Sequence, residues 1–135
     1  MTLFGGPNMY GRVLVVEDDF ELRQYLELML EQGTYHVMGA SDAFEALILA
    51  ERHEFDAAIC DIALPGMDGL QLIERWNSQG VTFPILVYSA NLTRSIAARA
   101  LELGVSDIVA KPSPAPIIQA KLSMAIDEAR RKAAS

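Results

Sequence analysis

The stretch VLVVEDD at residues 13–19 decides the fold, because a run of apolar residues passes directly into three consecutive acids. A second stretch, AAICD at residues 57–61, repeats this pattern with a single acid. Short apolar runs bounded by polar residues are typical of buried strands in a parallel sheet. In open α/β sheets, ligands bind just outside the carboxyl ends of such strands. Because crowded carboxylates repel one another unless a cation or proton compensates, the two stretches predict a cation site.

The rest of the chain alternates strand-like and helix-like segments, a pattern that favours a parallel α/β sheet. We expect five strands, over residues 12–17, 35–40, 56–61, 85–89 and 108–110. Each is followed by an apolar stripe at helical spacing, and the five stripes lie within residues 22–30, 43–50, 70–76, 92–103 and 118–129.

Several polar residues stand where a predicted helix begins. Asp19 is expected to be the N-cap of the first helix rather than a metal ligand. Asp42 and Glu45 have the spacing of a capping box. Ser113 is expected to cap the last helix, with Pro114 in its first turn.

Length and composition limit the classes of protein to consider. A chain of 135 residues with 51% hydrophobic content suits one folded domain. Its net charge, 11 − 18 = −7, argues against direct nucleic-acid binding. The lone Cys60 excludes an internal disulfide, and no apolar run approaches the roughly 20 residues of a membrane span. We expect a cytoplasmic protein without membrane association, with an N-terminal extension (1–11), one domain (12–130) and a C-terminal tail (131–135).

Groups able to do chemistry follow four of the predicted strands. These groups are the carboxylates of Glu17, Asp18 and Asp61, the hydroxyl of Ser89 and the ammonium of Lys111. If the first strand lies beside the third, as in the strand order 2-1-3-4-5, these groups converge at one edge of the sheet. Hard oxygen ligands of this kind suit Mg²⁺, with Mn²⁺ as an alternative.

In this order, the residues resemble the receiver domain of two-component response regulators. The resemblance extends from about residue 12 to about residue 130 and rests on Glu17-Asp18, Asp61, the 64–69 loop LPGMDG, Ser89-Ala90 and Lys111-Pro112. It implies an α/β fold of the flavodoxin-like (βα)5 type, a three-layer sandwich around a five-stranded parallel sheet in the order 2-1-3-4-5. It also implies a signalling switch that accepts a phosphoryl group and autodephosphorylates, and that is not an enzyme in the ordinary sense.

The resemblance gives the acidic residues separate roles. Asp61 would be the phosphoacceptor, taking its phosphoryl group from a phosphohistidine of a histidine kinase or a histidine phosphotransfer protein. Asp18 would bind Mg²⁺ directly and Glu17 through water. Asp61 itself and the backbone carbonyl of Ala63 would complete the protein ligands.

The resemblance also gives roles to residues that would hold the phosphoryl group. Lys111 would pair with one phosphoryl oxygen, and its bond to Pro112 would be cis, as is usual in the family. The Ser89 hydroxyl and the Ala90 backbone N–H would hold the other oxygens. A downstream output partner is implied without being identified, and a homodimer could form through the fourth helix, the last strand and the fifth helix.

One position departs from the family pattern and leaves an alternative open. Many receivers carry Tyr or Phe on the last strand, three residues before the lysine, where this chain has Ile108. A phosphorylation-independent protein-interaction module on the same fold is therefore the second hypothesis. A hydrolase or flavin-binding protein fits poorly, because the segment after residue 16 lacks a glycine-rich phosphate loop.

Overall fold

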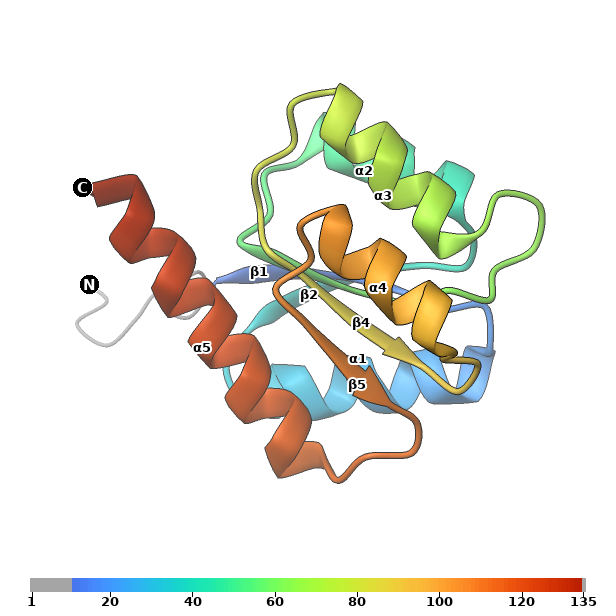
Figure 1. The fold of residues 1–135 in the computed structure, drawn as a ribbon. Coiled ribbons are helices and arrows are strands. Elements are labelled where there is room, and N and C mark those ends of the chain that lie inside the picture. The colour runs from blue at the N-terminus through green and yellow to red at the C-terminus, as the bar shows by residue number, and fades with distance from the viewer. Residues whose placement is uncertain (1–10, 135) are drawn as a thin grey trace.

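The computed structural model describes residues 11–134, in which strands and helices alternate (Figure 1). The elements are β1 (Arg12–Val16), α1 (Phe20–Gln32), β2 (His36–Ala40), α2 (Ala43–Arg52), β3 (Ala57–Cys60), α3 (Gly69–Ser78), β4 (Ile85–Ser89), α4 (Arg94–Glu102), β5 (Asp107–Ala110) and α5 (Ala115–Ala134). The paired strands are all parallel and stand in the order β2-β1-β3-β4-β5. The predicted fold class and strand order are confirmed. All but one residue of the predicted N-terminal extension lies outside the described residues.

Helices cover both faces of the sheet, so that the molecule has three layers (Figure 1). Strand residues alternate between the two faces. Leu14 and its neighbours on one face pack with side chains of α2, α3 and α4, including Trp76. Val13 and its neighbours on the other face pack with side chains of α1 and α5, including Leu122. Burial on both faces explains why the central strands are continuously apolar rather than alternating.

Side-chain caps fix the beginnings of the first two helices. Asp19 accepts a hydrogen bond from the N–H of Leu22 (3.1 Å), which confirms the predicted cap of α1. Asp42 accepts from the N–H of Glu45 (2.8 Å) at the start of α2. The predicted capping box is only half formed, because Glu45 accepts instead from the N–H of Ser41 (2.7 Å), one residue before the cap.

Two predicted helix starts need correction. Helix α4 begins at Arg94 with Thr93 as its N-cap, and Leu92 packs against the core from the preceding loop. Helix α5 begins at Ala115, so Ser113 lies two residues before it. Ser113 precedes Pro114, and a proline ring disfavours helical backbone at the residue before it, while the N–H of Ser113 donates to a side chain of β4.

Helix α5 is the longest element and runs past the amino ends of the strands (Figure 1). It continues through most of the predicted C-terminal tail to Ala134, and its last turns carry Arg131 and Lys132. Among the residues that the structure describes, no helix is both long and apolar enough to cross a membrane.

Candidate functional site

Backbone hydrogen bonds continue the sheet by one residue at two strand ends and so place two acids. The N–H of Asp61, just beyond β3, donates to the carbonyl of Val16 at the end of β1 (3.1 Å). The N–H of Glu17, just beyond β1, donates to the carbonyl of Ala40 at the end of β2 (3.0 Å). Both acids therefore inherit the register of buried strands, and their side chains meet at the carboxyl edge of the sheet.

Three carboxylates gather at this edge. Glu17, Asp18 and Asp61 each offer an oxygen, and these oxygens all lie within 4.8 Å of one another. Glu17 is 2% exposed and Asp61 is 5% exposed, whereas Asp18 is open to solvent. The structure thus brings together the three acids that the sequence singled out, and leaves one of them accessible from outside.

Lys111 joins the two buried acids. Its Nζ lies 2.7 Å from Oε1 of Glu17 and 2.7 Å from Oδ2 of Asp61. The remaining carboxylate oxygens accept from backbone N–H groups, Glu17 from that of Asp19 (3.1 Å) and Asp61 from that of Ala63 (3.2 Å). Each buried carboxylate is therefore hydrogen-bonded on both oxygens, as buried charges in proteins require.

Burial and the facing charges shift the ionisation of these groups. Burial raises the pKa of Glu17, although hydrogen bonds from Lys111 and Asp19 act against it. Burial also disfavours the ammonium of Lys111, but the hydrogen bonds that it donates to Asp61 and Glu17 outweigh burial and raise the pKa of Lys111. The neighbouring Cys60 is fully buried, and burial raises the pKa of its thiol, so it is an unreactive core residue.

The donor set fits a divalent cation of the Mg²⁺ type. Three carboxylates and one ammonium carry a net charge of −3 + 1 = −2, which one divalent cation neutralises. Carboxylate oxygens are the ligands that Mg²⁺ prefers. Ala63 has its backbone beside the cluster through the N–H bond to Asp61. The ligand role of its carbonyl stays a prediction.

Ser89 and Ala90 end the neighbouring strand at the same edge. Ser89 is completely buried at the end of β4, and its hydroxyl accepts weakly from the N–H of Asn91 (3.4 Å). Its carbonyl accepts from the N–H of Lys111 (3.0 Å), which ties the loop of the lysine to β4. The Lys111–Pro112 peptide bond is cis, as the family resemblance implied.

Three contacts of this site were not predicted from the sequence. The N–H of Ser113 donates to the hydroxyl of Tyr88 (3.1 Å), and Nζ of Lys111 lies 5.7 Å from the centre of the Tyr88 ring. Arg23 donates to the backbone carbonyl of Glu17 (2.7 Å). The contact of Tyr88 could have been anticipated, because Tyr88 lies in a predicted core strand and a buried tyrosine hydroxyl needs a hydrogen-bond partner.

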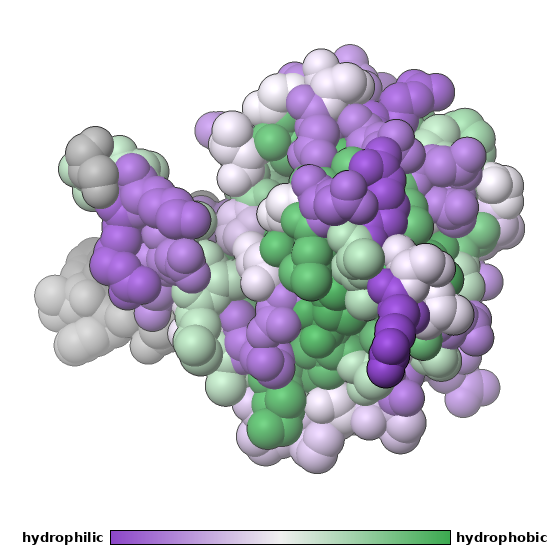
Figure 2. All heavy atoms as spheres, in the orientation of Figure 1, coloured by the Kyte–Doolittle hydropathy of each residue, from purple (hydrophilic) through white to green (hydrophobic). Residues whose placement is uncertain are grey.

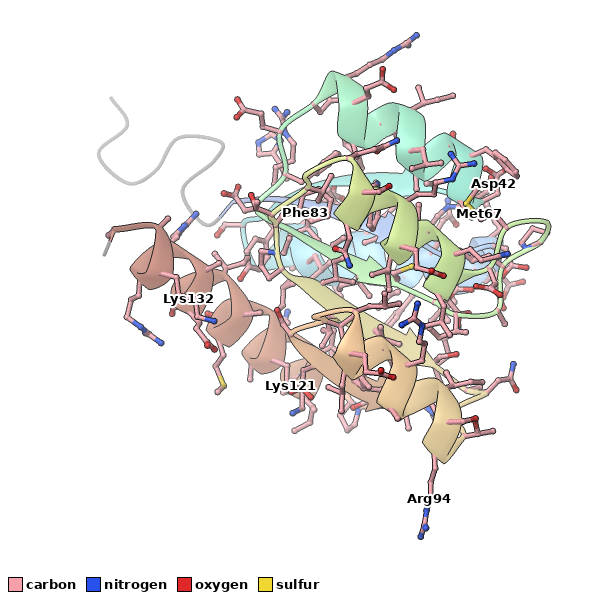
Figure 3. All side chains as sticks on the ribbon, turned by 45° about the horizontal axis from the view of Figure 1, so that its top comes forward. Asp42, Met67, Phe83, Arg94, Lys121 and Lys132 are labelled. Atoms are coloured by element: carbon pink, nitrogen blue, oxygen red, sulfur yellow. The ribbon has the colours of Figure 1, made fainter. Side chains whose placement is uncertain are left out.

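Two hollows lie at the opposite end of the molecule, at the amino ends of the strands under the last turns of α5. Phe83 lines both of them, and Lys132 lines the larger (Figure 3). Neither hollow includes a residue of the acidic cluster. The acidic cluster therefore lies at the carboxyl edge of the sheet, away from these two hollows.

Comparison with curated proteins gives close relatives. The transcriptional regulatory protein PhoP of Escherichia coli K12 is 43% identical over 101 residues, which are 75% of this chain and 45% of the relative. The virulence transcriptional regulatory protein PhoP of Salmonella typhimurium LT2 matches with the same identity and coverage. The chain therefore spans about half the length of these curated relatives.

Comparison with solved structures gives receiver domains. A CheY-like response regulator receiver domain protein from Methanospirillum hungatei superposes with a TM-score of 0.87, at 26% identity over 90% of this chain and 97% of the other. The non-phosphorylated HemR receiver domain from Leptospira biflexa superposes with a TM-score of 0.80, at 31% identity over 85% and 93%. The sequence pattern of the response regulator receiver domain family matches residues 13–123, which is most of the chain. This chain belongs to that family and is a receiver domain of a two-component response regulator.

Proposed function

We propose that Asp61 accepts a phosphoryl group from the phosphohistidine of a histidine kinase or of a histidine phosphotransfer protein. The observation that supports this most strongly is the grouping of Asp61 with two further acids within 4.8 Å and with the Lys111 ammonium at 2.7 Å. A structural ion pair alone would not need the exposed third acid, Asp18. The family of the chain supports the same function.

In the proposed reaction, a carboxylate oxygen of Asp61 attacks phosphorus while the bond between phosphorus and the histidine nitrogen breaks. The electron pair of that bond stays on the imidazole, and the product is an acyl phosphate on Asp61. Lys111 already contacts Asp61, so it is placed to hold one phosphoryl oxygen as charge shifts. The Ser89 hydroxyl and the Ala90 N–H would hold the others.

Glu17, Asp18, Asp61 and the Ala63 carbonyl are the residues that would hold Mg²⁺ or, in its place, Mn²⁺. When bound there, the cation would offset the negative charge that develops on the transferring phosphoryl group. We propose that the acyl phosphate is later hydrolysed on the same domain, so that the protein is a switch and not an enzyme that turns over an external substrate. The buried thiol of Cys60 supports the cytoplasm as its compartment.

We propose the surface formed by α4, β5 and α5 as the face whose partner changes on phosphorylation. Figure 2 shows apolar atoms in the region between α4 and α5. Leu101, Ile117 and Met124 are large apolar side chains of these two helices that are at least 45% exposed. The Lys121–Asp107 ion pair (2.7 Å) joins α5 to β5 on the same side. An apolar surface with a charged rim suits a protein partner, including a second copy of this chain.

The output itself is proposed from the relatives. The curated relatives are named transcriptional regulatory proteins, and this chain spans less than half of their length. We propose control of transcription as the output when this domain acts in a protein built like them, with the output carried by another part of that protein.

A phosphorylation-independent interaction module is the second candidate function. It is favoured by one observation, namely that Ile108 occupies the place of the usual switch aromatic on β5. An aliphatic side chain cannot present a polar ring edge to a partner, so the usual conformational change of an aromatic side chain on phosphorylation cannot occur at this position.

Exposure to acetyl phosphate distinguishes the two candidates. The domain is incubated with acetyl phosphate and Mg²⁺, and its intact mass is recorded for the wild type and for Asp61→Asn. The switch predicts a gain of one phosphoryl group that needs Mg²⁺ and that the variant lacks. If the folded wild type gains no phosphoryl group from acetyl phosphate or from a phosphorylated histidine kinase, the interaction module is the correct function.

A further inference from the structure

Tyr88 contacts the loop that carries Lys111 at two points. Its hydroxyl accepts a hydrogen bond from the N–H of Ser113 (3.1 Å), and its ring lies under Nζ of Lys111 at 5.7 Å. The side chain is 4% exposed, so these contacts are shielded from water. One rigid side chain of the sheet thus supports the loop on both sides of Pro112.

The position of Tyr88 in the strand explains how it reaches this loop. Tyr88 precedes Ser89 on β4, so the two side chains point to opposite faces of the sheet. Tyr88 packs in the core shared by the sheet with α1 and α5, whereas Ile108 packs on the other face. Tyr88 therefore does not replace the missing aromatic at Ile108. It supports the lysine loop from the α5 side.

We propose that Tyr88 is a positioning residue for Lys111 and that it sets the rate at which Asp61 is phosphorylated. This proposal rests on the proposed function, because Lys111 needs a fixed position only if it holds a phosphoryl oxygen. A lysine side chain has many rotamers, and fixing one of them costs conformational entropy. A ring packed against the side chain and a hydrogen-bonded loop reduce this entropy cost before the reaction begins.

Both contacts suit this role physically. A cation within about 6 Å of a ring centre is attracted by the ring, and more strongly where water is excluded. The hydrogen bond to Ser113 holds the backbone two residues beyond Lys111, where Pro112 has no N–H to contribute. Without the hydroxyl, the partly buried N–H of Ser113 loses its acceptor, and the loop is free to shift.

Two substitutions at Tyr88 separate the hydroxyl from the ring. Tyr88→Phe removes only the hydroxyl, and we expect phosphorylation by acetyl phosphate with Mg²⁺ to slow by about two- to tenfold, the value of one hydrogen bond. Tyr88→Leu also removes the ring, and we expect a further loss of about two- to tenfold. Tyr25→Phe, at a tyrosine that is 51% exposed on α1, is the matched control and should leave the rate unchanged.

A double-mutant cycle shows whether Tyr88 acts through Lys111. In the Lys111→Met background, Tyr88→Phe should leave the residual rate unchanged, because there is no ammonium to position. In the wild-type background, the amide proton of Ser113 should move upfield on Tyr88→Phe as it loses its acceptor. A merely structural role would slow both backgrounds by the same factor.

The outcomes are distinct. If the wild type is phosphorylated but Tyr88→Phe reacts at the rate of Tyr25→Phe, or slows the Lys111→Met background equally, the positioning role is wrong while the proposed function stands. If the folded wild type accepts no phosphoryl group, the proposed function fails and this proposal fails with it.

Discussion

Replacing Lys111 by methionine measures how strongly one ammonium holds the acidic edge together when no metal is bound. Methionine keeps an apolar stem of similar length but removes the charge that lies 2.7 Å from both Glu17 and Asp61. Removing one partner of a buried ion pair costs about 3–5 kcal/mol, because a charge is left uncompensated. The Lys111 side chain is 16% exposed, so nearby solvent screens the carboxylates and reduces this cost. We therefore expect a loss of about 2–3 kcal/mol.

Urea unfolding at neutral pH in EDTA measures this loss, with the fluorescence of the fully buried Trp76 as the signal. Lys132→Met is the matched control, since that lysine is 78% exposed and should cost little. Excess Mg²⁺ should then restore more stability to Lys111→Met than to the wild type, because the cation binds the folded state and compensates the same carboxylates. Equal losses for Lys111→Met and Lys132→Met in EDTA would refute this reasoning.

Three further predictions concern other parts of the domain. Burial acts to raise the pKa of Asp107, but the Lys121 ammonium and a backbone N–H outweigh burial and lower this pKa. The ion pair therefore stabilises the fold at pH values above the ordinary aspartate pKa, and this stabilisation is lost as the pH falls through the lowered pKa. Lys121→Met should raise that pKa in a carboxyl NMR titration, and an unchanged value would contradict the pairing. Gly69→Ala should destabilise by about 2–3 kcal/mol in urea, since its Cβ would lie 2.8 Å from the backbone after β3, whereas Gly33→Ala, with its nearest contact at 3.4 Å, should cost less. Ala63→Arg should change the rate of phosphate release from the phosphorylated domain without preventing phosphorylation, because its backbone N–H contacts the acceptor carboxylate; an unaltered rate counts against a role of this position in hydrolysis.

The order of strands and helices could be predicted because it depends on local patterns. Buried parallel strands are continuously apolar and surface helices carry one apolar stripe, so the local pattern of each segment indicates whether it is a strand or a helix. The helix starts were less predictable, because a cap is chosen by competition between neighbouring polar groups. Thr93 caps α4 although Leu92 already fits the apolar stripe, and Pro114 disfavours helical backbone at Ser113, so α5 begins at Ala115.

The residues of the candidate site could be predicted for a different reason. The carboxyl ends of parallel strands share one edge, so strand order alone brings the groups after β1, β3 and β4 together. What strand order cannot supply is which atoms touch. The double contact of Lys111 with Glu17 and Asp61 depends on the path of the loop after β5, which is fixed by tertiary contacts such as that of Tyr88.

Locating the phosphoryl group on the chain is the decisive test of the proposed switch. After treatment with acetyl phosphate and Mg²⁺, fragmentation mass spectrometry of the wild type should place one phosphoryl group on Asp61, and the same treatment in EDTA should give none. A phosphoryl group on another residue, or equal uptake by Asp61→Asn, would contradict the account of this acidic edge as a metal-dependent phosphoacceptor site.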